Sequence, residues 1–174
     1  MGIQFETDYN METLTAMAKG LRKTVRKKRS RRVHIFAAVV LIFGLLTILA
    51  TTAGGEPLGA SGVVTLLAML VVILVSLFED KLNAWFARKR LLPGTEHAVA
   101  TFEEDGYVSA TGVTESRFSY AQIVAVAETA RYFVFALSSH HTQAYDKRTI
   151  RGGSVEDFRA FIAEKTGKPI ANIK

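Results

Sequence analysis

Cysteine is absent from this 174-residue chain, and proline occurs only three times. Without cysteine the chain has no disulfide framework, no thiolate catalysis and no cysteine-ligated zinc or iron–sulfur centre. Acidic residues are also missing from two long apolar runs, Val33 to Ala53 and Leu58 to Phe78, whose one ionisable side chain is His34. A proton-coupled transporter or an ion pore needs ionisable groups at mid-depth, so this absence favours an anchoring role for both runs.

Each run has the roughly 20 residues that an α-helix needs to cross a hydrocarbon core about 30 Å thick. The connection between the runs contains Gly54, Gly55 and Pro57 and no Lys or Arg, whereas thirteen of the 22 Lys and Arg residues flank the runs on their outer sides. The positive-inside rule therefore predicts a two-pass hairpin in the inner (plasma) membrane with both termini in the cytoplasm. We expect a retained span rather than a cleaved signal peptide, because the first run begins behind a long charged segment.

The net charge of +6 and the high isoelectric point come from these flanks. Residues 93–174 contain nine basic and ten acidic residues, so the charge is no evidence for a nucleic-acid surface. Basic side chains near a bilayer bind anionic headgroups, at about 1 kcal/mol each. The candidate contacts for anionic lipid or a partner protein are Lys19, Arg22, Lys23, Arg26, Lys27, Arg88, Lys89, Arg90, Lys147, Arg148 and Arg151.

The pattern predicts four regions: an N-terminal part (1–32), the transmembrane hairpin (33–78), a basic juxtamembrane helix and linker (79–95) and a cytoplasmic domain (96–174). In the first, Ile3 to Thr7 alternates as a short strand that must join a sheet elsewhere. Met11, Leu14 and Leu21 follow at helical spacing, and we expect this cationic amphipathic helix to run directly into the first span. Two roles stay open for it: binding of anionic lipid, or a topology-setting flank that packs on the domain. After the second span, the helix is expected to end at Leu92, before Pro93-Gly94.

Small residues form a stripe on each span, and such stripes let helix backbones approach closely in lipid. Their members are Ala37, Gly44 and Thr51 on the first span and Ser61, Thr65 and Ala68 on the second. They serve either to pack the two helices of one hairpin or to form homo-oligomers.

Beyond Glu96 the apolar residues alternate, which predicts strands joined by hairpins. The expected strands are 98–103 and 107–111 around the turn-forming Asp105-Gly106, then 123–127, 132–137 and 142–145, with one helical turn at 119–122. A C-terminal helix follows, with Ser154 as N-cap, Asp157 in a capping box and Gly167 at its end. The sequence therefore predicts an α+β membrane protein: a transmembrane hairpin plus a small antiparallel β meander or roll closed by a C-terminal helix, as in pleckstrin-homology-like domains. The strand at Ile3 to Thr7 is expected to supply a missing edge.

The order of these features resembles the YcxB-like membrane proteins of bacteria. The shared segments are Phe102 to Gly106, Phe118 to Ile123, the aromatic strand Tyr132 to Leu137 and the basic pair within Tyr145 to Ile150. Relatives usually read Ile-Pro-Lys-Arg in the last segment, so Asp146 departs from the pattern and puts the turn geometry there in question. The resemblance implies the architecture and no established activity, cofactor or catalytic residue.

Recognisable catalytic and metal-ligating patterns are absent from the sequence. His140 and His141 are adjacent and project in different directions, and Glu103 to Asp105 lack the spaced ligands of a calcium loop. Lys147, Arg148 and Arg151 either contact a phosphate, headgroup or acidic partner, or form a solvated loop paired with Asp146 or Glu156.

We therefore expect a non-enzymatic adaptor without cofactor or metal, whose hairpin tethers a protein-binding or lipid-binding domain at the membrane. Its partners would be the lipid bilayer and a protein or a second copy of the chain. The alternative is an oligomeric small channel or permeability factor formed by the hairpins.

Overall fold

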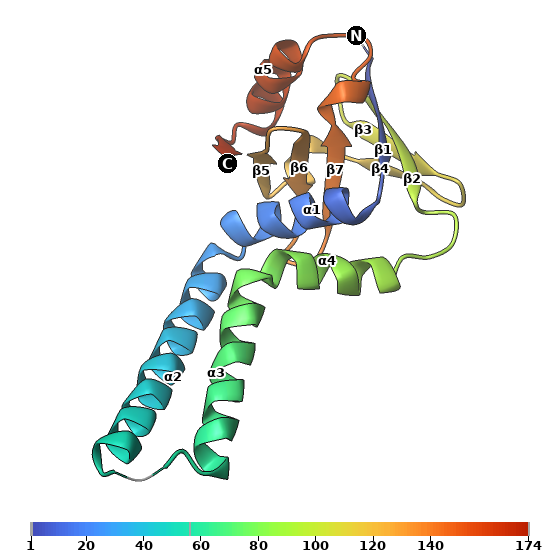
Figure 1. Ribbon diagram of the computed structural model, residues 1–174. Coiled ribbons are helices and arrows are strands. Elements are labelled where there is room, and N and C mark those ends of the chain that lie inside the picture. The colour runs from blue at the N-terminus through green and yellow to red at the C-terminus, as the bar shows by residue number, and fades with distance from the viewer. Residues whose placement is uncertain (1, 56, 174) are drawn as a thin grey trace. The chain divides into compact units, whose positions relative to one another are not determined.

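Two stretches of chain far apart in the sequence build one unit of this protein. The computed structural model describes residues 2–55 and 57–173 (Figure 1). Met1–Lys27 and Asn83–Lys174 together form one unit, here called the sheet unit, and Lys28–Leu82 form the hairpin unit. The expected α+β content, with antiparallel sheets and two long apolar helices, is confirmed.

The first sheet has the strand order β1-β2-β3-β4, with every pair antiparallel. Its strands are β1 (Ile3–Asp8), β2 (His97–Phe102), β3 (Tyr107–Thr111) and β4 (Glu115–Phe118). The N-terminal strand does pair with the later part of the chain, in a register from Ile3 opposite Phe102 to Asp8 opposite His97. The sequence did not predict β4, because its side chains are mostly polar and exposed.

The second sheet has the order β7-β6-β5-β8. Its strands are β5 (Ala125–Glu128), β6 (Tyr132–Ala136), β7 (Thr142–Asp146) and β8 (Ile170–Asn172). The strand expected at 123–127 starts later, because Ile123 ends a 3₁₀ turn, η1 (Tyr120–Gln122), and its N–H donates to the Tyr120 carbonyl at 3.1 Å. The short β8 was not expected, and it pairs parallel to β5 rather than antiparallel.

Helix α1 (Met11–Lys23) begins at Asn10, whose side chain accepts from the N–H groups of Glu12 and Thr13. It packs on the second sheet at Gly20, where an added Cβ would lie 2.7 Å from Val134 Cγ1. The expectation that this helix runs directly into the first span is wrong. It ends at Lys23, and a turn at residues 24–26 separates it from the next helix.

Aromatic side chains from both sheets and from helix α5 (Val155–Thr166) meet in the core. Phe158 of α5 lies with its ring 4.6 Å from Phe5, 4.8 Å from Phe102 and 5.0 Å from Phe133. The predicted punctuation of α5 is confirmed: Ser154 and Asp157 form the capping box, and Gly167 ends the helix in the left-handed conformation, with φ 61°. One helix thus closes the space between the two sheets.

The hairpin unit consists of α2 (Lys27–Ala53), α3 (Ala60–Leu77) and the start of α4 (Glu79–Lys89). Both long helices expose large apolar side chains along their length, with no buried residue in either. Glu56, in the connection between them, lies outside the described residues. Helix α4 ends at Lys89, three residues before the expected Leu92, because Arg90 and Leu91 donate to carbonyls only three residues back.

Candidate functional site

The carboxylate of Glu128, at the end of β5, is enclosed with only 7% of its side chain exposed. Arg159 of α5 donates to both of its oxygens at 2.8 Å, and Lys147 Nζ reaches Oε1 at 2.8 Å. The hydrogen bonds from Arg159, and then those from Lys147, lower the pKa of Glu128 to about 2 against the opposing effect of its burial. Lys147 was predicted as a surface contact for lipid or a partner. Its side chain is only 13% exposed, and its ammonium group binds the Glu128 carboxylate.

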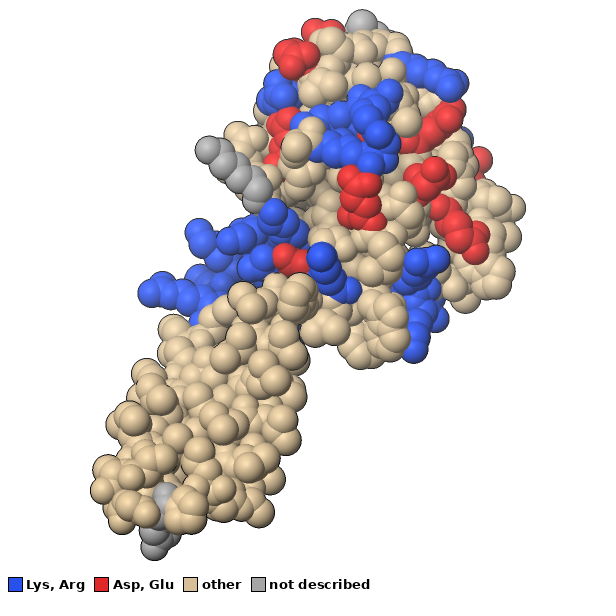
Figure 2. All heavy atoms as spheres, in the orientation of Figure 1, with Lys and Arg blue, Asp and Glu red and all other residues tan. Residues whose placement is uncertain are grey.

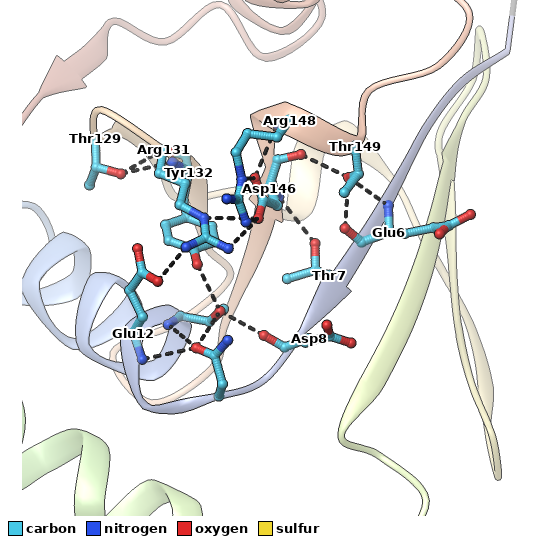
Figure 3. A network of polar contacts seen from close by, with 12 residues as sticks. Glu6, Thr7, Asp8, Glu12, Thr129, Arg131, Tyr132, Asp146, Arg148 and Thr149 are labelled. Atoms are coloured by element: carbon cyan, nitrogen blue, oxygen red, sulfur yellow. Dashed lines mark hydrogen bonds and ion pairs between the residues drawn. The ribbon is translucent and has the colours of Figure 1, made fainter.

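A second enclosed carboxylate, Asp146 at the end of β7, binds two arginines (Figure 3). Arg131 Nε donates to Oδ2 at 3.0 Å, and Arg148 donates through Nε to Oδ1 at 3.1 Å and through Nη2 to Oδ2 at 2.9 Å. The backbone N–H of Asp146 donates to Thr7 Oγ1 at 3.1 Å, and Arg131 continues to Glu12. This network joins β1 and α1 to the second sheet.

Further contacts tie the same elements together in Figure 3. The Thr13 hydroxyl donates to the Asp8 carbonyl at 2.6 Å and lies 3.2 Å from the Tyr132 hydroxyl. The Thr149 hydroxyl donates to the Glu6 carbonyl at 2.7 Å and accepts from the Glu6 N–H at 3.0 Å. These contacts hold the N-terminal strand and helix on the rest of the sheet unit.

Some of the basic residues predicted as lipid or partner contacts bind other groups of the protein, and others are exposed. Arg148 binds Asp146, and Arg151, with 67% of its side chain exposed, pairs with Glu6 at 3.1 Å. Arg26 donates through Nε to the Ser139 carbonyl at 2.6 Å. The others in exposed positions are Lys23, Lys27, Arg88, Lys89 and Arg90, while Lys19 and Arg22 are half-buried and have partners. Their role as lipid or partner contacts stays a prediction.

Exposed aromatic rings accompany the basic residues of α4. Trp85 and Phe86 have 44% and 52% of their surface exposed, and their rings meet edge to face at 4.9 Å. Lys89 Nζ lies 3.7 Å from the centre of the Trp85 ring. A cation over an exposed indole combines the two side-chain types that favour a membrane interface.

Within the hairpin unit, α2 and α3 touch along half-buried stripes. Ala37, Gly44 and Thr51 lie on the α2 stripe, and a Cβ on Gly44 would lie 2.8 Å from the sulfur of Met69 and 3.5 Å from a methyl of Thr65. The α3 stripe differs from the expected one, because it carries Gly62, Thr65, Met69, Val72 and Ser76, whereas Ser61 and Ala68 are exposed. Helical periodicity places 62, 65, 69, 72 and 76 on one face. On the face seen in Figure 2 the apolar length of the hairpin bears no Lys, Arg, Asp or Glu.

A pocket of about 270 Å³ lies in the sheet unit, and sequence reasoning missed it. Its walls come from β3, β4, the start of β7, helix α1 and the linker before β2. Tyr9 lies in its wall, and burial raises the pKa of this tyrosine to about 12. The serines and threonines that line it carry no sequence signal of a site, since each is common in strands and turns.

Among the described residues, no group of three or more His, Asp or Glu is arranged to hold a metal ion. His140 lies with Nδ1 3.1 Å from Nη2 of Arg26, and the His141 ring lies against Phe118 at 6.1 Å. The two adjacent histidines thus have different surroundings.

Comparison with known proteins bears on the central part of the sheet unit. The family of YcxB-like proteins matches residues 102–162, from the end of β2 into α5. This stretch includes Glu128, Asp146, Lys147 and Arg159 and leaves out β1, α1, the hairpin and β8. No curated protein and no solved structure matches the chain. The resemblance expected from the sequence is confirmed for residues 102–162, which are similar to the YcxB-like proteins.

Proposed function

We propose that this chain is a non-enzymatic integral membrane protein whose hairpin tethers the sheet unit at the inner surface of the bacterial plasma membrane. One observation carries the proposal: α2 and α3 are long and apolar enough to cross a membrane. An 18-residue stretch of α2 has a mean hydropathy of 2.7 and one of α3 has 2.6, and neither stretch is buried. Exposed apolar surface of this extent needs a lipid or protein cover. At 1.5 Å per residue, the 18 residues of α3 span about 27 Å, close to a hydrocarbon core of about 30 Å.

The basic flanks support an orientation with both termini in the cytoplasm. Lys28, Arg29, Arg31 and Arg32 occupy the first turns of α2. Arg88 and Lys89 end α4, and Arg90 follows directly. The sheet unit is built from chain on both sides of the hairpin, so its two parts must lie on the same side of any bilayer that the hairpin crosses.

The tethered unit would act as a pleckstrin-homology-like binding domain. Two sheets of mainly antiparallel strands closed by α5 support this assignment. Binding rather than catalysis is favoured because both enclosed carboxylates, Glu128 and Asp146, are held by two cations each. The pKa of Glu128, held at about 2, makes this carboxylate a poor proton acceptor, which disfavours acid–base chemistry at Glu128.

The absence of native cysteine gives a direct test of orientation. Single cysteines are introduced as Gly54→Cys in the turn and Ser138→Cys in the β6–β7 connection, and intact cells are treated with a membrane-impermeant maleimide. We expect labelling of the turn cysteine in intact cells and of the domain cysteine only after lysis. The cysteine-free parent is the blank, and labelling of Ser138→Cys in intact cells would overturn the orientation.

Anionic lipid is the binding target that the exposed basic end of α4 favours, with Trp85 beside Lys89. The triple variant Arg88→Gln, Lys89→Gln and Arg90→Gln should retain less phosphatidylglycerol than the parent when purified chains are analysed by native mass spectrometry. Arg117→Gln, at a side chain with 82% exposure on β4, is the control. Equal retention in all three proteins would leave a protein partner as the target.

The alternative, a channel of oligomerised hairpins, has less support. Its motivation was the stripe of small residues, but Gly44 faces Met69 and Thr65 of the same hairpin. Planar-bilayer recording of the purified chain tests it, and reproducible unitary conductance would favour the channel over the tether.

A further inference from the structure

The pocket of about 270 Å³ is lined by both polar and apolar side chains. Strands β3, β4 and β7 supply polar ones, among them Ser109, Ser116, Thr142 and Gln143. Leu14 and Met17 of α1, Leu91 of the linker and Phe118 of β4 supply the apolar lining. Pockets at the mouth of a rolled sheet, with few polar groups among apolar ones, are common ligand sites.

The register of β3 and β4 explains why the space is open. Tyr107 lies opposite Phe118, and their rings stack at 5.1 Å, which fills the interior at that level. Two residues further along β3 on the same face, Ser109 lies opposite Ser116. This pair of small side chains stands where large apolar ones would complete a core, so the space beside it stays unfilled.

Polar groups without a protein partner face this space. Gln143, only 6% exposed, accepts at Oε1 from the hydroxyls of Tyr107 and Tyr145, both at 2.7 Å. Its carboxamide N–H₂ and the hydroxyl of Ser109, a residue only 9% exposed, make no hydrogen bond to any described residue. In the part of the chain that the structure describes, no fully enclosed side-chain nitrogen or oxygen lacks a partner. These unpaired groups are therefore reached from the pocket and are available to a ligand.

The lining also limits the charge of the ligand. Among the described residues that line the pocket there is no Lys, Arg, Asp or Glu, and the titratable ones are His141 and Tyr9. An ionised ligand would lose its hydration without gaining an opposite full charge. Hydroxyl groups of Ser, Thr and Tyr both donate and accept, which matches a ligand that carries hydroxyls itself.

We propose that this pocket binds an uncharged polyhydroxylated molecule of about monosaccharide size. The hydroxyls would meet Ser109, Ser116 and Gln143, and the less polar ring face would lie against apolar side chains of the lining such as Leu14 and Met17. The volume is just below the roughly 300–1,000 Å³ of sites for drug-sized ligands, in keeping with a single sugar or cyclitol ring. Such a ring comes from two sources, a free sugar or the uncharged headgroup of a glycolipid. The site does not depend on the proposed membrane function.

The test uses the full chain in a detergent without a sugar headgroup, because maltoside or glucoside would compete. Binding of D-glucose, D-galactose, myo-inositol and glucose 6-phosphate is titrated by saturation-transfer NMR. We expect saturable millimolar or tighter binding of at least one uncharged probe and at least tenfold weaker binding of the phosphate ester. Nanodiscs that contain monogalactosyl diacylglycerol distinguish the two sources. If the glycolipid displaces free galactose from the pocket, the ligand is a lipid headgroup. If it does not, the ligand is a free sugar.

Ser116→Leu places a larger side chain on an exposed strand that borders the pocket and should weaken binding at least tenfold. Arg117→Leu puts the same side chain on the next residue of β4, outside the pocket lining, and should leave binding unchanged. If Ser116→Leu fails to fold, the isosteric Thr142→Val supplies the measurement, with an expected three- to tenfold loss. No saturable binding of any uncharged probe, preference for the phosphate ester, or binding unaffected by both pocket variants would overturn the proposal.

Discussion

Replacing Glu128 with glutamine should destabilise the sheet unit in a pH-dependent way. The substitution keeps the size of the side chain and removes the charge that Arg159 and Lys147 share. Those contacts join the end of β5, the 3₁₀ turn η2 (Lys147–Thr149) and α5. Loss of the carboxylate therefore weakens the attachment of α5 to the second sheet.

The magnitude follows from the pKa of Glu128, which falls from 4.5 to about 2 in the folded chain. Because the folded pKa lies below the unfolded one, the charge stabilises the fold fully above pH 4.5, and this contribution disappears as the pH falls through about 2. At about 1.4 kcal/mol for each pKa unit, the contribution is about 3 kcal/mol at pH 7. About 1.4 kcal/mol remains at pH 3 by the same linkage.

Urea unfolding of the detergent-solubilised chain, followed by near-ultraviolet circular dichroism of the aromatic core, measures this difference. The gap in unfolding free energy between parent and Glu128→Gln should shrink from about 3 kcal/mol at pH 7 to about half of that at pH 3. Glu164→Gln, at an exposed carboxylate of α5, is the control and should have the same unfolding free energy as the parent at pH 7 and at pH 3. An equal gap at pH 3 and pH 7 would refute the ion-pair account of Glu128.

Two smaller perturbations test how α1 and α5 are held. Gly20→Ala should destabilise by about 1 kcal/mol in the same urea assay, because overlap with the buried Val134 outweighs a gain of about 1 kcal/mol in helix propensity. In a Val134→Ala background Gly20→Ala should instead be neutral or stabilising, and an unchanged penalty would exclude the close contact as its cause. Ser154→Ala removes the cap of α5 and should cost about 1 kcal/mol. Faster amide exchange in the first turn of α5 reports that loss, and unaltered exchange there would contradict a capping role.

Local signals predicted the elements that carry them. Asp105-Gly106 marked the β2–β3 hairpin, and Ser154 with Gly167 marked both ends of α5. Strand β4 carries no such signal, because its polar side chains are exposed and its backbone is placed by β3. Strand β8 depends on parallel pairing with β5, more than 40 residues earlier, which no local pattern encodes.

The enclosed carboxylates show the same limit at the candidate site. Lys147 and Arg148 stand out in the sequence as a basic pair, yet their partners depend on the fold. Lys147 binds a carboxylate from β5, while Arg148 binds its near neighbour Asp146, as the solvated-loop interpretation expected. Asp146 has a φ of −72°, which a proline also adopts, but its N–H donates to Thr7, which a proline cannot do. Asp146 therefore supplies a hydrogen bond to β1 that a proline at this position could not supply.

Strand β1 contributes side chains to the aromatic core of the sheet unit. Phe5 of β1 lies between aromatic rings of both sheets and α5: its ring is 5.8 Å from Phe102, 6.5 Å from Phe133 and 4.6 Å from Phe158. A segment that began at residue 96 would lack this ring, the β1 partner of β2 and the α1 cover of Val134. The hairpin lies between β1 and β2 in the sequence, so β2 can pair with β1 only after the hairpin has been made. The sheet unit can therefore form only when the start of α2 and the end of α3 are on the same side of the membrane that the hairpin is proposed to cross.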